Sequence, residues 1–469
     1  MKRNRTQQLK AWLIGGICFL VIPNILFWLL DTRMYLIRGI FVAEYFFIAL
    51  LYPYISRRVF NILWLTFALF DLIFASTSLF FMDFAQMLEA LSGLTHISSW
   101  QVVKLVFLAS IFVFISWLLL ILLKKIDGRI HFLKPKIILT YLLLVILIDY
   151  VGGANTLNVK SDQATLRINQ NVISVPIFSV GLHIVWSFRK EKEWGVTPAR
   201  SVAKEVFGVD NSSDTAERIQ LLVLVESWGS LKNEQLQRNI TRPLHEMAAK
   251  KEYILREGLT PYRFLTQIAE MREITGYLRT FPSQDTAFIR KNSLFIEKQR
   301  QGYQVVGLHG YASGFYNREK CWPALGVQQM FFAKEFSSYG LRFGGNPFFR
   351  GATDTAIANW LMNQIALQKE RKMFYYWVTL NTHLPLSNRN DAGFRSYVHQ
   401  WKESGIDSEV LQLSYQLTEF FTVLAEAINR SGTRMHVLLV GDHAPPFVDR
   451  AQREVYDPQF VPFMELKPK

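Results

Sequence analysis

Five long apolar runs precede Gly153 and constrain the fold of this 469-residue chain more than any other feature. Each run is close to the ~20 residues that a helix needs to cross the hydrocarbon core of a bilayer. They also explain why 50% of the residues are hydrophobic, a share that is high for a soluble protein. The runs span 11–30, 37–54, 59–82, 102–123 and 137–151. We therefore expect a transmembrane domain of five helices over residues 1–153.

Charged residues around the runs predict the orientation of this domain. Lys and Arg cluster before the first run, between the second and third, and between the fourth and fifth, whereas 83–100 contains neither. Arg33 and Arg38, between the first two runs, oppose this trend. The positive-inside rule places the N-terminus in the cytoplasm, and an odd number of spans places the chain after Gly153 on the outer side. A cleaved signal peptide is the alternative for the first run, but that run lacks a small-residue cleavage site and four more runs follow it.

Two features of the membrane part have alternative interpretations. Glu44 and Asp71 lie within apolar runs, where they either line a substrate path or pair with other polar groups of the bundle. Residues 172–194 combine apolar side chains and tryptophans with a basic cluster. That composition is typical of a segment on the membrane surface, but also of a helix packed on the next domain. We expect 154–217 to be a juxtamembrane linker that contains this segment.

The sequence after Arg218 has a different pattern, in which short continuous apolar runs alternate with helix-length segments. The runs are "IQLLVLVE", "YQVVGLHG", "MFYYWVTLN" and "MHVLLVGD". Such runs are typical of parallel strands that are buried on both faces, so we expect an α/β domain with a mostly parallel central sheet over 218–469. No disulfide can form within this domain, because the chain has only two cysteines and one of them, Cys18, lies in the first apolar run.

The chain is basic, with a formal net charge of +14 that is shared by the apolar part and the part after it. A basic domain on the outer side of a membrane favours anionic lipid headgroups or anionic polymers as partners. Nucleic acid is not an expected partner on that side.

Three potential metal ligands follow predicted strands. Glu226 ends the first strand, in "LVLVESWG", whereas Asp442 and His443 end the last one, in "LLVGDHAPPF". Parallel strands end at a common carboxyl edge of the sheet, where sites form, so these three side chains are expected to meet. Two carboxylates and an imidazole suit a divalent metal that takes one or two more oxygen ligands.

Five short motifs follow one another along the chain: "VESWG", "FLTQIAEMRE", "LHGYASGFYNREKCWPALG", "TLNTHLPL" and "GDHAPPF". In order and spacing they resemble the membrane-bound branch of the alkaline phosphatase and sulfatase superfamily, which comprises lipoteichoic acid synthase-like phosphoglycerol transferases and phosphoethanolamine transferases. The resemblance covers essentially the whole chain. It implies a five-helix transmembrane bundle followed by an extracytoplasmic, sulfatase-like (alkaline phosphatase-type) α/β domain. The two prolines after Ala444 depart from lipoteichoic acid synthases, which leaves the transferred group and its acceptor open.

In that family the fourth metal ligand is a threonine that begins a helix and is also the nucleophile. Thr266 follows a proline-aromatic loop and precedes Glu270, as the family's threonine precedes a glutamate, whereas Thr275 lies inside the ensuing helix-like segment. We therefore choose Thr266. The free N–H groups and the dipole of a helix start stabilise an alkoxide and an incoming phosphate, and metal coordination further lowers the pKa of the hydroxyl. A simple N-cap is the alternative role for this residue.

The resemblance also implies the residues that bind the substrate. Arg318, in "FYNR", is expected on the phosphate or headgroup, since its planar fork suits a phosphodiester, with Tyr316 beside it. His383, in "LNTHLPL", is expected to hydrogen-bond the phosphoryl oxygens or to act as general acid to a leaving alkoxide. His309, at the end of another predicted strand, is expected to have a similar substrate-binding role.

Together these residues imply a multi-pass enzyme of the bacterial inner membrane whose catalytic domain lies on the extracytoplasmic side. Its expected reaction transfers phosphoglycerol from phosphatidylglycerol to a surface glycan or glycolipid through a phospho-threonine at Thr266. The expected cofactor is one divalent metal ion, Mn²⁺, with Zn²⁺ or Mg²⁺ as alternatives. The ligands are Glu226, Thr266, Asp442 and His443.

Three alternatives to this reaction remain. The first is transfer of phosphoethanolamine from phosphatidylethanolamine. The second is plain hydrolysis, although a sulfatase needs an arginine downstream of its modified cysteine, and Cys321 in "KCWPALG" lacks it. The third is an inactive scaffold for polysaccharide assembly, which would not need to hold a metal ion.

Overall fold

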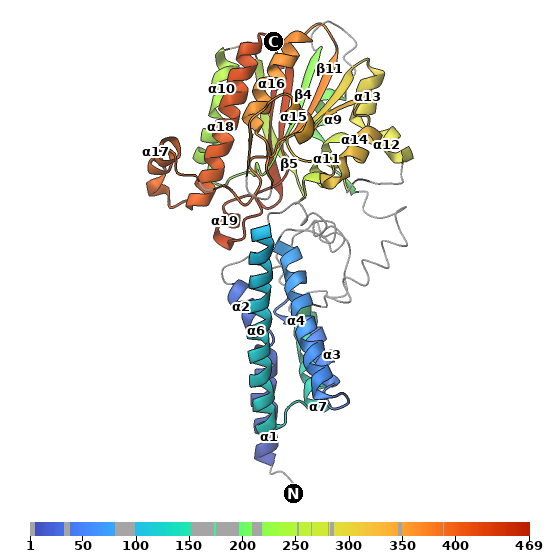
Figure 1. Ribbon diagram of the computed structural model, residues 1–469, viewed down its shortest axis with the longest axis vertical. Coiled ribbons are helices and arrows are strands. Elements are labelled where there is room, and N and C mark those ends of the chain that lie inside the picture. The colour runs from blue at the N-terminus through green and yellow to red at the C-terminus, as the bar shows by residue number, and fades with distance from the viewer. Residues whose placement is uncertain are drawn as a thin grey trace. The chain divides into compact units, whose positions relative to one another are not determined.

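The computed structural model divides the chain into two compact units, Met1–Lys190 and Glu191–Lys469 (Figure 1). The described residues are 5–31, 38–79, 99–151, 173–174, 197–208, 218–250, 253–263, 265–279, 281, 286–345, 349–387 and 389–469.

The first unit is helical. Its helices are α1 (Arg5–Val21), α2 (Ile25–Asp31), α3 (Ala43–Leu50), α4 (Arg57–Leu79), α6 (Ser99–Ile130) and α7 (Pro135–Val151). Among the described residues, two stretches are long and apolar enough to cross a membrane, Arg57–Ala75 and Val106–Arg129. The first apolar run is divided into α1 and α2 around Pro23, which cannot donate a backbone hydrogen bond. The second run contains only the eight-residue α3, so five spans remain a prediction.

An ion pair is buried within the first unit. Nε and Nη2 of Arg38 donate to the carboxylate of Asp71 at 3.0 and 2.7 Å, and the two side chains are 2% and 0% exposed. Nη2 also donates to Oδ1 of Asn24 at 2.9 Å. Asp71 therefore pairs within the bundle, and Arg38, which opposed the charge trend of the loops, is its partner. Glu44 is buried in the first turn of α3.

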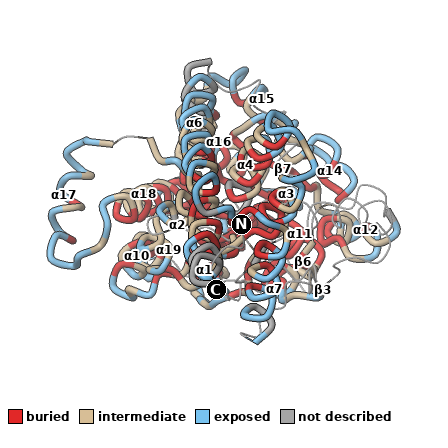
Figure 2. The backbone as a smooth tube through the Cα atoms, turned by 90° about the horizontal axis from the view of Figure 1, so that it is seen from below, coloured by how far each residue is buried: buried red, intermediate tan, exposed pale blue. Residues whose placement is uncertain are grey.

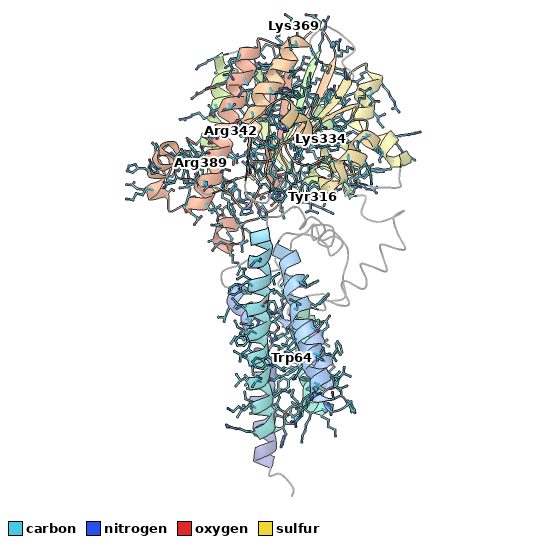
Figure 3. All side chains as sticks on the ribbon, viewed as in Figure 1. Trp64, Tyr316, Lys334, Arg342, Lys369 and Arg389 are labelled. Carbon is cyan, nitrogen blue, oxygen red and sulfur yellow. The ribbon has the colours of Figure 1, made fainter. Side chains whose placement is uncertain are left out.

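Aromatic side chains fill much of the space between these helices. Trp64 of α4, labelled in Figure 3, contacts the rings of Phe19, Tyr45 and Phe60. A short parallel pair, β1 (Phe41–Val42) with β2 (Ile173–Ser174), joins the start of α3 to the segment that follows α7. β2 belongs to the predicted surface segment 172–194, whose other residues lie outside the described part of the chain.

The second unit is built around a seven-stranded sheet with the order β5-β13-β12-β4-β11-β7-β8. Five neighbouring strands, from β12 to β8, are parallel, and β13 is antiparallel to β12 and β5. The strands are β4 (Ile219–Val225), β5 (Tyr253–Pro261), β7 (Gln304–His309), β8 (Gln329–Phe331), β11 (Met373–Val378), β12 (His436–Gly441) and β13 (Phe460–Pro468). The expected α/β domain with a mostly parallel central sheet is therefore present.

Helices cover both faces of this sheet, in two layers that Figure 1 shows on opposite sides. The first layer is α10 (Glu234–Lys250), α16 (Asp354–Leu367) and α18 (Ser408–Ser431); the second is α9 (Val202–Phe207), α11 (Thr266–Thr275), α13 (Leu294–Arg300) and α14 (Arg318–Leu325). Side chains alternate along a strand, so that Leu221 and Val223 of β4 pack with the first layer, whereas Leu222 and Leu224 pack with the second. Figure 2 shows in red the buried stretches of α10, α16 and α18 of the first layer and of α11 and α14 of the second.

Smaller elements complete the described part of the second unit. They are β3 (Thr197–Pro198), β6 (Tyr277–Leu278), β9 (Phe343–Gly344), β10 (Gly351–Ala352), α12 (Thr286–Asn292), α15 (Ala333–Ser338), α17 (Ala392–Gln400), α19 (Arg450–Glu454) and the 3₁₀ turns Phe315–Asn317 and Lys402–Ser404. β3 pairs with β6, and α9 packs on α11. Both β3 and α9 lie within the predicted linker 154–217 and are part of this unit.

Candidate active site

The neighbouring strands β4 and β12 end level with each other. Gly441, the last residue of β12, is paired with Val225, the last residue of β4. The next residue of each strand is a carboxylate, Asp442 or Glu226, and both are buried, at 0% and 4% exposed. The parallel register therefore places two acidic side chains at the carboxyl edge of the sheet, where ligand sites of α/β proteins form.

Helix α11 presents Thr266 to this acidic pair. Thr266 is the first residue of the helix, and the preceding N-cap residue, Leu265, provides no side-chain cap. Oγ1 of Thr266 lies 3.0 Å from Oδ2 of Asp442 and 3.3 Å from Oε2 of Glu226. The hydroxyl is thus directed to the sheet edge rather than back to its own helix. Thr275, at the other end of α11, donates its hydroxyl to the carbonyl of Met271 at 2.6 Å.

His443 completes a group of four potential ligands. Its Nε2 lies 3.2 Å from Oδ2 of Asp442, 3.4 Å from Oγ1 of Thr266 and 3.5 Å from Oε1 of Glu226. Burial and the nearby charge of Glu226 raise the pKa of Asp442, because two carboxylates in a dry environment destabilise each other's ionised form. A divalent cation would remove this repulsion, and carboxylate, imidazole and hydroxyl are suitable donors for one. The residues present therefore fit a metal ion.

Neighbouring groups hold the two carboxylates in place. Ser227 follows Glu226 with φ of 55°, a left-handed conformation that is uncommon for residues other than glycine and is concentrated at functional sites. Its backbone N–H donates to Oδ1 of Asp442 at 2.8 Å, and its hydroxyl donates to Oε1 of Glu226 at 2.9 Å. Thr379 accepts the backbone N–H of Glu226, and Thr382 donates to its carbonyl. Only the position of Ser227 after Glu226 could have been noticed in the sequence.

Arg318 is the first residue of α14 and is 2% exposed. Its Nε and Nη2 donate to Oε1 of Glu270 at 3.0 and 2.8 Å. Burial alone would lower the pKa of Arg318, but the Glu270 carboxylate raises it above its ordinary value, so the guanidinium stays charged. The centre of the Tyr316 ring, labelled in Figure 3, lies 5.2 Å from Cζ of this guanidinium. Tyr316 and Asn317, which directly precede Arg318, both have positive φ.

The two predicted histidines are neutral. Burial lowers the pKa of His309 well below its usual range and lowers that of His383 to about 4, and the charge of Arg318 contributes to both shifts. Nδ1 of His309 lies 3.0 Å from the carbonyl of Val378, so Nδ1 carries the proton and Nε2 is an acceptor. That Nε2 is buried and has no hydrogen-bond partner among the described residues. Nδ1 of His383 lies 2.6 Å from the carbonyl of Leu384.

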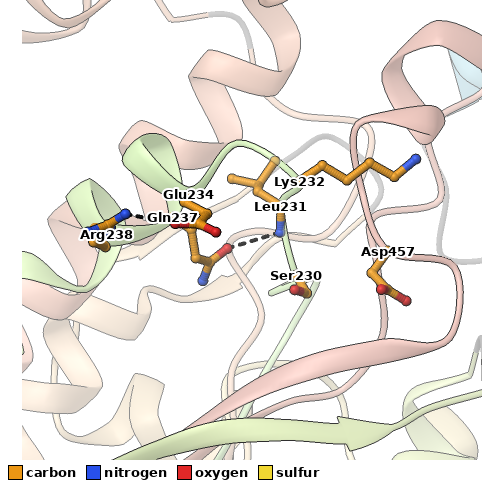
Figure 4. A pocket seen from close by; sticks show the side chains of 7 residues that line it. All are labelled: Ser230, Leu231, Lys232, Glu234, Gln237, Arg238 and Asp457. Carbon is orange, nitrogen blue, oxygen red and sulfur yellow. Dashed lines mark hydrogen bonds and ion pairs between the residues drawn. The ribbon is translucent and has the colours of Figure 1, made fainter.

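A hollow of about 420 Å³ lies on another part of the second unit (Figure 4). None of the predicted site residues lines it. Its lining residues are Ser230, Leu231, Lys232, Glu234, Gln237, Arg238 and Asp457.

The chain is similar to known proteins at the level of solved structures. No family model and no curated protein matches the chain. Solved structures that are similar include the lipoteichoic acid synthase LtaP of Listeria monocytogenes (15% identity, 56% of this chain and 70% of that chain covered, TM-score 0.39) and the phosphoglycerol transferase GacH of Streptococcus pyogenes (12%, 56% and 71%, 0.37). Another is the lipooligosaccharide phosphoethanolamine transferase EptA of Neisseria meningitidis (14%, 76% and 68%, 0.42). Similarity at this level assigns no activity to this chain.

Proposed function

We propose that this protein transfers a phosphorus-containing headgroup from a membrane phospholipid to a surface glycan or glycolipid through a phospho-threonine at Thr266. The observation that carries the proposal is the position of the Thr266 hydroxyl. Thr266 begins helix α11. Its Oγ1 lies 3.0–3.4 Å from a carboxylate oxygen of Asp442, a carboxylate oxygen of Glu226 and Nε2 of His443. A hydroxyl that contacts two buried carboxylates and an imidazole has the surroundings of an activated nucleophile.

Glu226, Thr266, Asp442 and His443 would together hold one divalent cation, for which we propose Mn²⁺, with Zn²⁺ or Mg²⁺ as alternatives. When bound, such an ion lowers the pKa of a hydroxyl and stabilises negative charge on phosphoryl oxygens. The start of α11 contributes in the same direction, since its N–H groups and dipole favour an anion beside Thr266.

The remaining site residues bind the phosphoryl group and move protons. Arg318 is permanently charged and suits the phosphoryl oxygens. Nε2 of His309 is a buried acceptor, which suits a hydroxyl or ammonium group of the donor headgroup. His383 is neutral at pH 7, so we assign it the proton of the attacking acceptor hydroxyl, and its protonated form returns a proton to a leaving alkoxide.

The reaction has two balanced steps. In the first, Oγ1 of Thr266 forms a bond to phosphorus, the bond from phosphorus to the diacylglycerol oxygen breaks, and the proton that Thr266 loses passes to the diacylglycerol that leaves. In the second, an acceptor hydroxyl forms the new ester bond, and Thr266 leaves phosphorus and regains its proton. Phosphatidylglycerol is the first choice of donor, because the "FYNR" segment is nearest that branch of the family; phosphatidylethanolamine is the second.

This reaction requires the catalytic unit to meet lipid at the outer leaflet. We propose five spans in 1–153, a juxtamembrane linker over 154–217 whose elements β3 and α9 pack on the second unit, and a catalytic domain over 218–469 on the extracytoplasmic side of a bacterial inner membrane. Two stretches of sufficient length and apolarity, Arg57–Ala75 and Val106–Arg129, support an integral membrane protein.

Mass spectrometry of the full chain tests the proposal. The purified protein is incubated with Mn²⁺ and either phospholipid in vesicles, diacylglycerol is measured, and the peptide that contains Thr266 is examined for an adduct. We expect a glycerophosphate adduct on this peptide. Thr266→Val should abolish the adduct and lower the rate of diacylglycerol release by at least about a thousandfold. Thr275→Val, which loses a hydroxyl at the other end of α11, is the matched control and is expected to retain the adduct.

Each other outcome has a distinct meaning. An ethanolamine-phosphate mass would keep the mechanism and change the donor. An adduct on Thr275 would overturn the choice of nucleophile. Absence of both adduct and diacylglycerol with either lipid would contradict transfer from these two donors and would leave an enzyme with another donor or an inactive scaffold. Metal analysis would then separate these two, because a scaffold need not retain a divalent ion.

A further inference from the structure

Glu270 lies one helical turn after Thr266 on α11 and is 4% exposed. Its two oxygens accept four hydrogen bonds. Oε1 accepts from Nε and Nη2 of Arg318 at 3.0 and 2.8 Å. Oε2 accepts from Nε1 of Trp322 at 2.8 Å and from the hydroxyl of Tyr376 at 3.2 Å. Donors therefore hold the carboxylate at both of its oxygens.

A buried ion pair of this kind is a weak source of stability. Removing a carboxylate and a guanidinium from water costs several kcal/mol for each, and well-packed apolar residues of similar volume are often equally stable or more so. The pair between Glu270 and Arg318 lies among apolar side chains of α11 and α14. Stability of the fold is therefore not a sufficient reason for this pair.

The pair also fixes which end of Arg318 is available. The edge formed by Nε and Nη2 is occupied by Glu270, whereas Nη1 is buried and has no hydrogen-bond partner among the described residues. A buried donor without a partner carries the full desolvation penalty of that group, so a ligand oxygen at Nη1 would be strongly favoured. Glu270 thereby leaves one defined face of the guanidinium for an anion.

Glu270 connects three elements that meet at the site. Thr266 and Glu270 belong to one rigid helix, whereas Arg318 and Trp322 belong to α14 and Tyr376 to β11. Because helix residues four positions apart lie on the same face, the helix fixes the spacing of the backbone positions from which the Thr266 hydroxyl and the Glu270 carboxylate extend.

We propose that Glu270 is a positioning residue, which acts through Arg318 by holding Nη1 toward the phosphoryl group attached to Thr266. This inference rests on the proposed function of Thr266 and Arg318. It requires that the effect of Glu270 on the reaction depend on Arg318. A residue that only supports the fold would lower activity to the same extent whether or not Arg318 were present.

A double-mutant cycle distinguishes these two roles. Diacylglycerol release from phosphatidylglycerol vesicles is measured for the full chain with Glu270→Gln, Arg318→Ala and both changes. We expect Glu270→Gln to lower kcat/KM by about 100-fold, since a misplacement of about 1 Å has this effect. In the Arg318→Ala background, we expect Glu270→Gln to lower it no further. Losses that multiply would overturn the proposal.

Glu273→Gln is the matched control in the same cycle. Glu273 lies on the same helix, is equally buried, and also pairs with an arginine, since its Oε1 accepts from Nε of Arg272 at 2.6 Å. It has no bond to Arg318 among the contacts described, so its effect should multiply with that of Arg318→Ala. Glu270→Asp is a second variant that keeps the charge but withdraws the carboxylate. If Glu270→Asp unfolds at the wild-type temperature but has a reduced kcat/KM, the result supports the positioning role. Full activity of Glu270→Asp contradicts it.

Binding of inorganic phosphate separates failure of this inference from failure of the proposed function. If wild-type protein releases no diacylglycerol from either lipid, the headgroup-transfer proposal fails. Calorimetric titration of the Mn²⁺-loaded full chain with phosphate then tests Glu270 directly. We expect Glu270→Gln to weaken phosphate binding at least tenfold, equivalent to about 1.4 kcal/mol, and to have no further effect in the Arg318→Ala background. Equal weakening in both backgrounds would reject the positioning role.

Discussion

At the level of single residues, the arrangement of Glu226 and Asp442 is unfavourable for the protein without a cation. Both carboxylates are buried and both contact the same hydroxyl. Like charges in an environment of low dielectric repel strongly. The basic group that contacts both carboxylates is His443; burial lowers its pKa, but the charges of Asp442 and Glu226 outweigh burial and raise it, and no arginine or lysine is bonded to either carboxylate in the contacts described. Sites of this kind trade stability for function, so a substitution that removes function is expected to stabilise the metal-free protein.

The first prediction concerns Glu226→Gln. The amide keeps the size of the side chain and an acceptor for the Ser227 hydroxyl, but it removes one of the two charges. In EDTA, we expect the midpoint of thermal unfolding to rise by about 2–4 °C, which corresponds to about 1 kcal/mol for a unit of this size. Mn²⁺ should stabilise the wild-type protein and not the variant, because ligand binding to the folded state raises its stability. Calorimetry with and without EDTA measures both effects.

Glu234→Gln is the control for this measurement. Glu234 is 82% exposed and forms an ion pair with Arg238 on the surface of α10. Exposed pairs contribute little, so neither the unfolding midpoint nor its response to Mn²⁺ should change. A fall in the midpoint of metal-free Glu226→Gln would show that the two carboxylates do not repel each other and would weaken the interpretation of the site.

At the level of elements, α11 organises the site from several sides. Its first residue is Thr266, and Glu270 holds Arg318. Arg272, which is fully buried, donates to the carbonyls of Pro261 and Gly441, both at 3.0 Å. Gly441 directly precedes Asp442, and Pro261 is the last residue of β5, before the loop that leads to Thr266. The same helix therefore holds the strand end that carries one ligand and the loop that delivers the nucleophile.

The second prediction concerns the buried pair of Arg272 and Glu273. Arg272→Met leaves Glu273 charged, buried and without its partner, which is expected to destabilise the protein by about 3–5 kcal/mol. Adding Glu273→Gln removes this charge and keeps an acceptor for the backbone N–H of Ala203. The double variant should therefore be more stable than Arg272→Met alone. Urea midpoints followed by tryptophan fluorescence measure the difference, and a double variant less stable than either single one would contradict the argument.

How far the sequence predicts this molecule depends on whether a feature is local. Four of the seven sheet strands, β4, β7, β11 and β12, were predicted because burial on both faces leaves continuous apolar runs. The meeting of Glu226 with Asp442 followed from the rule that parallel strands end at one edge. The partners of Glu270 were not predictable. Arg318 and Tyr376 are 48 and 106 residues away in the chain, and no local pattern indicates which distant side chain satisfies a buried carboxylate.

The apolar runs show the same limit in the first unit. Their length predicted spans, but the interruption at Pro23 and the short α3 depend on local chemistry within a run. The pairing of Arg38 with Asp71 depends on contacts between helices. Window hydropathy averages over such residues, so it detects membrane-compatible composition more reliably than the number of continuous helices.

At the level of the whole molecule, the proposed function gives the two compact units different roles: the first would anchor the protein in the membrane that contains the donor lipid, and the second would carry out the chemistry. A tether converts an encounter with a membrane lipid into an intramolecular event, which can raise the apparent affinity for that lipid by a factor of about 10²–10⁴. All proposed catalytic groups lie in the second unit, between Glu226 and His443. Separation of the units should therefore affect lipid substrates and not soluble ones.

The third prediction tests this division with a protease site inserted between Ser174 and Thr197 of the full chain in vesicles. The protein folds intact and is then cleaved. We expect turnover of bis(p-nitrophenyl) phosphate, a soluble phosphodiester, to be unchanged, because the site does not depend on the tether. Release of diacylglycerol from phosphatidylglycerol in the same vesicles should fall by about 100-fold, because the donor is no longer held near the site.

The same chain without the inserted site, treated with protease, is the control. Equal losses on both substrates would mean that the first unit completes the active site, and no loss on either would mean that the tether does not deliver the donor.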